Sequence, residues 1–269
     1  MGILGVIKKA FIHTSKLMNV VLVFFVFNVV IGLISLPLAN PARAGNPGIV
    51  AISVISSILF FLIFIFLQGG ALGLVKDQLK TAAASMAQFM VYGKKFYLRI
   101  LGLLLLYILI AIGVVLLLSL VSAGILLLGD NIVTRSLVAT VVTVVAVAVI
   151  TLLVYPIYTI VVEDKGAFAA LKRGIQVAKS NFWKTLGLFM AMLGISLLIS
   201  LIIGFILGLV TVPLGANVSQ VLIAIVNAAV QSYIPVVMMI AFMSFYMFLT
   251  EAQTQVKSPE ESTSGLGEG

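Results

Sequence analysis

Polar residues that could form a site within apolar surroundings are concentrated in two segments of the sequence. Asn227 and Gln231 are four residues apart, so a helix places both amides on one face, and Pro235 follows them. Tyr155 and Pro156 form the second group. A proline within a helix lacks the N–H that would bond the carbonyl four residues earlier, which kinks the helix and frees an acceptor. We predict that these five residues are polar or kink positions, which serve either hydrogen bonding between helices or a ligand pocket.

The residue types needed for catalysis or metal binding are scarce. The sequence contains no cysteine and one histidine, which excludes thiolate nucleophiles, disulfides and cysteine- or histidine-rich metal sites. The long apolar stretches contain no ionisable residue of the kind that marks a proton relay or an ion pathway within a membrane. No acid, base and nucleophile form a catalytic set. We therefore predict no catalytic residue, no metal, no cofactor and no enzymatic activity.

The composition indicates a membrane protein. Hydrophobic residues make up 62% of the 269 residues and charged residues only 9%, whereas a typical soluble domain has about 25% charged residues. The net charge is +8, yet the basic residues flank apolar stretches instead of forming one continuous basic face. This distribution favours anionic lipid headgroups as partners over nucleic acid.

Six stretches are long and apolar enough to cross a bilayer, because about 20 apolar helical residues span its hydrocarbon core. The sequence therefore predicts an all-α membrane protein, with one transmembrane domain over residues 1–250 and a polar, disordered cytoplasmic tail over residues 251–269. The predicted spans cover residues 17–38, 49–68, 100–128, 137–162, 185–210 and 221–249.

The distribution of basic residues predicts the orientation. All but two of the 16 Lys and Arg residues lie in the N-terminal arm, the second and fourth connections or the tail, and only Arg43 and Arg135 lie in the opposite loops. Because short loops rich in Lys and Arg stay in the cytoplasm, both termini are predicted there. Alternatively, Ala42-Arg43-Ala44 resembles a signal-peptide cleavage site, although the apolar run before it is longer than usual.

Two cytoplasmic connections combine helical apolar periodicity with basic residues. One apolar stripe runs from Leu72 to Phe89 and the other from Phe168 to Phe182. We predict two amphipathic interfacial helices, whose apolar faces pack on the bundle, enter lipid or bind a partner protein. The basic and aromatic residues predicted at the interface are Lys94, Lys95, Arg99, Lys172, Arg173, Lys179, Trp183 and Lys184.

The two stripes end in similar sequences. Basic and aromatic residues lead into Leu101-Gly102 and into Leu186-Gly187, each at the start of a span, and the N-terminal arm is a looser version. This pattern suggests a threefold repeat of an interfacial helix followed by a pair of spans. Gly204 and Gly208, four residues apart, favour close helix packing, either within the chain or between chains.

The segment Val162-Glu163-Asp164-Lys165-Gly166 through Asn181-Phe182-Trp183, with Tyr155-Pro156 upstream, resembles a signature of prokaryotic six-helix membrane proteins. These are the YciC-type inner-membrane family and the membrane domain of some glycerophosphoryl diester phosphodiesterases. The sequence departs from them in two respects: Gly174 stands where they often have Ser, and the soluble phosphodiesterase domain is missing. The resemblance implies a six-helix architecture of largely unknown function, located in the inner (cytoplasmic) membrane of a prokaryote, and supplies no catalytic residue.

Two main functions follow as hypotheses, and a third, an enzyme that acts on lipid at the cytoplasmic face, is disfavoured because no acid, base and nucleophile can be named for it. The first is a non-enzymatic membrane protein that associates with lipid, with a membrane protein partner or with a second copy of itself. The alternative is a permease or transporter for a neutral or lipid-like solute, in which Pro156, Asn227, Gln231 and Pro235 shape the pathway.

Overall fold

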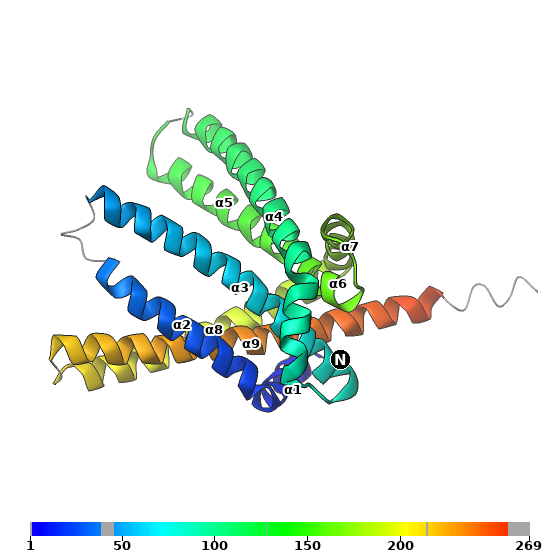
Figure 1. Ribbon diagram of the computed structural model, residues 1–269. Coiled ribbons are helices and arrows are strands. Elements are labelled where there is room, and N and C mark those ends of the chain that lie inside the picture. Colours follow the sequence, from blue (N-terminus) through cyan, green and yellow to red (C-terminus); the bar gives the residue numbers. More distant parts are fainter. Residues whose placement is uncertain (1, 39–45, 128, 214, 258–269) are drawn as a thin grey trace, which may run out of the picture. The chain divides into compact units, whose positions relative to one another are not determined.

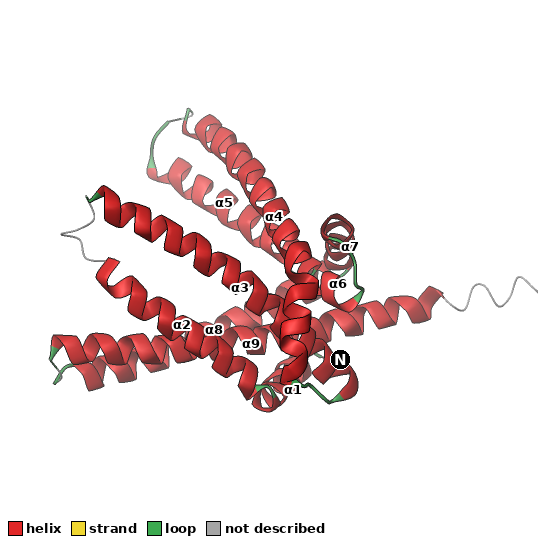
Figure 2. Ribbon diagram, in the orientation of Figure 1, coloured by secondary structure: helices red, strands yellow, loops and turns green. Residues whose placement is uncertain are grey.

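The computed structural model describes residues 2–38, 46–127, 129–213 and 215–257, and this described chain is helical with no strand (Figures 1 and 2). Among the described residues, six helical segments are long and apolar enough to cross a membrane, which makes the protein a multi-pass membrane protein and confirms the predicted number of six such segments. The elements are α1 (Ile3–Lys16), α2 (Met18–Leu38), α3 (Pro47–Thr81), the 3-10 turn η2 (Met86–Gln88), α4 (Phe89–Leu126), α5 (Ile132–Leu153), α6 (Pro156–Val162), α7 (Ala167–Ser180), α8 (Phe182–Thr211) and α9 (Ala216–Lys257).

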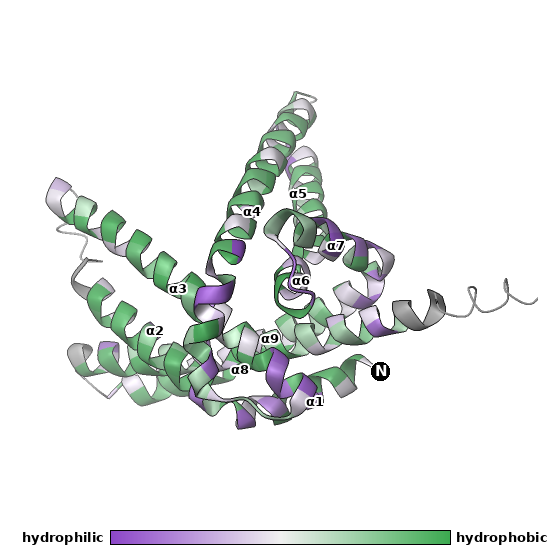
Figure 3. Ribbon diagram, turned by 45° about the vertical axis from the view of Figure 1, so that its right-hand side comes forward, coloured by the Kyte–Doolittle hydropathy of each residue, from purple (hydrophilic) through white to green (hydrophobic). Residues whose placement is uncertain are grey.

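The chain divides into two compact units. The first comprises the described residues within Met1–Tyr97 and Gly187–Phe245, and the second those within Leu98–Leu186 and Tyr246–Gly269. In both, the long helices are hydrophobic along most of their length, and hydrophilic residues gather on the short helices α1 and α7 (Figure 3). A mostly apolar surface on the long helices is what lipid-facing segments require.

Glycines bring α3 against the start of α4 in the first unit. A Cβ atom on Gly70 would lie 2.8 Å from the carbonyl oxygen of Phe89, and one on Gly73 would lie 2.2 Å from the ring of Tyr92. Small residues permit such close backbone approach between membrane helices. By contrast, a Cβ on Gly204 or Gly208 would meet no described atom within 4 Å, so the described residues supply no packing partner within the chain for that pair.

The predicted amphipathic helix over residues 72–89 is wrong. Helix α3 continues past the predicted end of its span to Thr81 and stops at Ala82, whose φ of 55° is left-handed. The stripe is therefore divided among three elements: Val75 is buried on α3, Met86 is exposed in η2, and Phe89 begins α4. Spacing alone could not reveal this break, because it lies in a run of alanines that suits a helix. The threefold repeat stays a prediction.

Helix α9 also continues beyond its predicted limit. It ends at Lys257, so residues 251–257 of the predicted tail are helical. This stretch is rich in good helix formers such as Ala, Gln and Glu, which lets the helix propagate out of its apolar part. The remaining tail residues, 258–269, and the Ala42-Arg43-Ala44 sequence lie outside the described residues.

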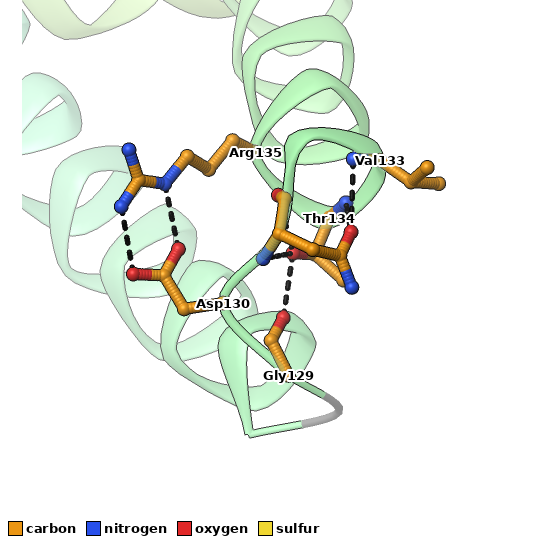
Figure 4. Close-up of polar contacts among 6 residues, drawn as sticks. Gly129, Asp130, Val133, Thr134 and Arg135 are labelled. Carbon is orange, nitrogen blue, oxygen red and sulfur yellow. Dashed lines mark hydrogen bonds and ion pairs between the residues drawn. The ribbon is translucent and has the colours of Figure 1, made fainter.

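The connection between α4 and α5 satisfies its own polar groups (Figure 4). The Asn131 side chain accepts hydrogen bonds from the amides of Val133 (2.9 Å) and Thr134 (3.0 Å), while the Thr134 hydroxyl accepts one from the amide of Asn131 (3.1 Å). Arg135 holds Asp130 with two hydrogen bonds of 2.6 and 2.7 Å, which lower the pKa of that carboxyl. Such a capping box makes this turn a stable hairpin tip.

The fourth span is interrupted in the second unit. Helix α5 ends at Leu153, and α6 begins at Pro156, whose missing N–H costs nothing at the first position of a helix. The hydroxyl of Tyr107 on α4 donates to the carbonyl of Leu153 at 2.8 Å. At this break the chain leaves α5 and enters α6. The carbonyl of Leu153, which ends α5, is satisfied by the hydroxyl of Tyr107.

Candidate functional site

Helix α7 docks on the proline at this break. It packs against α5 and α6 through a face on which Ala170, Gly174 and Val177 are buried. A Cβ atom on Gly174 would lie 2.4 Å from the backbone nitrogen of Pro156. Only glycine therefore allows this approach, and the backbone of α7 lies directly on the proline that the sequence had marked as a kink position.

A carboxylate joins α7 to its neighbours. Glu163 is the C-cap residue that follows α6. Its Oε2 lies 2.5 Å from the Nζ of Lys165, and its Oε1 lies 3.5 Å from the Nε of Arg173 on α7. The hydroxyl of Tyr246 on α9 donates a hydrogen bond to the same carboxylate. We call these four residues the Glu163 cluster. The sequence prediction included only Arg173, as an interface residue.

Buried hydroxyls extend this cluster. Thr159 on α6 donates to the hydroxyl of Tyr246 at 3.0 Å, and Thr185 on α8 donates to the hydroxyl of Tyr155 at 3.1 Å. The rings of Tyr155 and Tyr246 lie 5.5 Å apart, and both side chains are fully buried. Among the described residues no buried side-chain nitrogen or oxygen lacks a hydrogen-bond partner. A satisfied polar network of this kind fixes one arrangement of helices.

The neighbouring acidic residue is also paired. Asp164 has a left-handed φ of 55°, which Asp tolerates better than most residues. Arg99 on α4 holds it with a 2.5 Å contact to the carboxylate and a 3.0 Å hydrogen bond to the carbonyl. Arg99 was predicted to face the interface, and the structure places it in this ion pair, half-exposed.

The electrostatics of Glu163 suit a structural role. Burial opposes its ionisation, but hydrogen bonds from Lys165 and Tyr246 and the charges of Lys165 and Arg173 outweigh it, so the pKa of Glu163 lies below its ordinary value. The carboxylate is therefore ionised at neutral pH and already bonded, which makes it a poor general base. Within the described chain, no cluster of three or more His, Cys, Asp or Glu residues could hold a metal ion.

The opposite side of α7 is exposed within the described part of the chain. Phe168 is 73% exposed and Trp183, just beyond α7, is 79% exposed, whereas Ala178 of the predicted stripe is buried. Lys172 and Lys179 are exposed on the helix and make no ion pair within the described part of the chain. Lys184, and Lys94 and Lys95 of the first unit, are exposed as well.

Two predicted residues of the first unit lie in one pocket. Asn227 and Gln231 of α9 line a pocket of about 410 Å³. Pro235 lies within α9, one turn beyond Gln231, and the helix continues through it. Asn28 of α2, which the sequence analysis missed, is part of the pocket and donates to the hydroxyl of Ser232 at 3.0 Å. The full lining is Asn28, Ile31, Gly32, Gln220, Ile223, Ala224, Asn227, Ala228 and Gln231.

Comparison with protein families gives one match. The family model described as a domain of unknown function, DUF7847, matches residues 17–249. The chain belongs to the DUF7847 family. The matched range contains the residues that line the pocket, the Glu163 cluster and α7, but not helix α1. No curated protein matches this DUF7847 chain. No solved structure matches it either.

Proposed function

We propose that this DUF7847 protein is a non-enzymatic, lipid-associating protein of the inner membrane of a prokaryote, with both termini in the cytoplasm. In this proposal α7 binds anionic headgroups on the cytoplasmic side. The observation that carries it is the side of α7 that the described residues leave exposed, with Phe168, Lys172 and Lys179, next to the exposed Trp183 at the start of α8.

Two physical effects support this assignment. Aromatic and basic side chains are the usual anchors at the boundary between headgroups and hydrocarbon. Each lysine close to an anionic surface adds about 1 kcal/mol of attraction. The docking of Gly174 on Pro156 and the Glu163 cluster hold α7 in place before any lipid arrives, so little ordering is required on binding.

The experiment uses Trp183, the only tryptophan in the chain, as an energy-transfer donor. The protein is reconstituted in vesicles that contain dansyl-labelled phosphatidylglycerol or dansyl-labelled phosphatidylcholine at equal density. We expect stronger transfer to the anionic lipid, and equal transfer to both lipids in Lys172→Glu/Lys179→Glu. The matched control, Lys172→Arg/Lys179→Arg, keeps the charge and keeps the preference. A preference that survives charge reversal would refute the proposal.

The resemblance to YciC-type proteins stays a proposal, supported by the position of the motif after the fourth span. The permease alternative is supported by a different observation, the pocket that contains Asn227 and Gln231. Flux of a neutral solute through proteoliposomes tests it, with Asn227→Ala/Gln231→Ala expected to reduce transport. Unchanged flux in that variant would count against a permease.

A further inference from the structure

The pocket between α2 and α9 contains amides that the chain does not satisfy. The Asn28 amide donates to Ser232. Asn227 and Gln231, in contrast, are exposed and make no side-chain hydrogen bond within the described part of the chain. Both lie in the span Val218–Ala252, where hydrocarbon offers an amide no partner. An unsatisfied amide in such surroundings costs several kcal/mol, so these two groups call for a partner from outside the described chain.

The pocket is long and follows α9 from one end of the span. Gln220 lies near the start of α9 and Gln231 eleven residues later, which corresponds to about 16 Å along a helix. Pro235 cannot donate to the carbonyl of Gln231, four residues earlier. The end of the pocket near Gln231 therefore offers both hydrogen-bond donors, from the side-chain amides, and acceptors, from these amides and the free backbone carbonyl. Gly32 on α2 leaves room opposite them, because no described atom lies within 4 Å of its Cβ position.

The lining defines the chemistry of the occupant. No charged residue is among the lining residues, so an ionised group would be buried without a counter-ion. Amides both donate and accept, which matches a group that carries a hydroxyl and a carbonyl. The rest of the lining is Ile, Ala and Gly. The volume of about 410 Å³ falls in the range of roughly 300–1,000 Å³ that is usual for small-molecule sites.

We propose that this pocket binds the uncharged polar group of a membrane amphiphile, such as the hydroxyl and ester groups of a diacylglycerol. Asn227 and Gln231 bond that group, and the acyl chains extend into the bilayer along α2 and α9. This inference concerns the first unit and an uncharged ligand, so it is independent of headgroup binding by α7. Binding does not require transport, and unchanged solute flux would leave it standing.

The test is photocrosslinking of the full-length protein with a diacylglycerol that carries a diazirine in one acyl chain, with adducts mapped by mass spectrometry. We expect adducts on α2 and α9 in the wild type. Gly32→Leu adds an apolar side chain at a lining position of α2 whose Cβ would meet no described atom within 4 Å. We expect adducts at least tenfold weaker, the effect of losing about 1.4 kcal/mol of binding. The control Gly113→Leu, on α4, is also made where a Cβ would meet no described atom within 4 Å, and it should label like the wild type.

A second variant tests the amides separately. Asn227→Leu/Gln231→Leu keeps the side chains of similar size and suits lipid surroundings, so the protein should still fold. We again expect about tenfold weaker labelling, the effect of about 1.4 kcal/mol. Equal labelling of wild type and both pocket variants would overturn the proposal, as would equal labelling by a phosphatidylglycerol probe. Loss of a dimer without loss of lipid adducts in the amide variant would also overturn it, because the amides would then pair two copies.

Discussion

The two units differ in whether their polar side chains have hydrogen-bond partners within the chain. In the second unit, Glu163 is bonded by Lys165, Arg173 and Tyr246, and the result is a fixed α7. In the first unit, Asn227 and Gln231 line a pocket and have no side-chain hydrogen bond within the described part of the chain. We infer from this difference that polar side chains with hydrogen-bond partners inside the chain hold its helices together, and that polar side chains without such partners mark where another molecule binds.

The largest effect is expected from the contact that docks α7. Gly174→Ala would place a Cβ 2.4 Å from the backbone nitrogen of Pro156, and backbone cannot rotate away as a side chain can. Overpacking of this kind costs about 1–3 kcal/mol, and we expect the upper end. Thermal unfolding in detergent and hydrogen exchange of residues 167–180 measure it. Gly113→Ala, whose Cβ meets no atom within 4 Å, is the control. Equal behaviour of the two variants would show that α7 does not pack as described.

Removal of the charge at Glu163 should have the next largest effect. Glu163→Gln keeps an acceptor for Tyr246 but leaves Lys165 and Arg173 without their counter-ion. A hydrogen bond to a charged group is worth about 1.5–3 kcal/mol, and partial exposure of this cluster places our expectation near 1–2 kcal/mol. The same unfolding assay measures it, with Asp130→Asn in the exposed turn between α4 and α5 as the control. If both carboxamide variants were equally stable, the cluster would not hold α7.

Acidic pH should protonate Glu163 in the wild type and so cause the same loss of stability as Glu163→Gln. Because the pKa of Glu163 in the folded protein is lowered, its contribution is complete above the ordinary carboxyl pKa of about 4.3 and is lost as pH falls through the folded value. We expect the emission of Trp183, next to the end of α7, to change below about pH 4. Glu163→Gln should lack this transition. A transition of the same midpoint in the variant would assign it to another group.

The smallest expected effect is a difference in stability between substitutions of two asparagines that line the same pocket. Asn28 is bonded to Ser232, and a hydrogen bond between membrane helices is worth about 0.6 kcal/mol on average. Asn28→Leu should therefore destabilise the ligand-free protein slightly. Asn227→Leu removes no bond among the described residues and should leave stability unchanged or raise it. Unfolding curves in lipid-free detergent compare the two, and a larger cost for Asn227→Leu would mean that its amide already has a partner.

The spans could be predicted from sequence because long apolar runs must form helices in a bilayer. The ends of helices could not, because basic residues such as Lys76 and Lys80, which predict the edge of a span, do not stop a helix. Helix α3 therefore passes the predicted boundary. Its packing through Gly70 and Gly73 depends on a partner segment that hydropathy does not reveal.

The candidate sites were predictable only where spacing along one helix sufficed. Asn227 and Gln231 share a face because they are four residues apart, and both line the pocket. Asn28 was missed because its partner, Ser232, is 204 positions away. The same limit applies to Glu163 and Tyr246, separated by 83 positions. Charges close to a span were assigned to the lipid interface, whereas Arg173 pairs within the chain.

The location of Trp183 tests the account of α7 most directly, because its fluorescence is the only tryptophan signal of the protein. The measurement is quenching in vesicles by lipids that carry a spin label either near the headgroup or deep in the acyl chain. With α7 at the membrane surface, the shallow label should quench Trp183 more strongly than the deep label, and a water-soluble quencher should have an intermediate effect. Strong quenching from water with neither lipid label effective would contradict lipid association by α7.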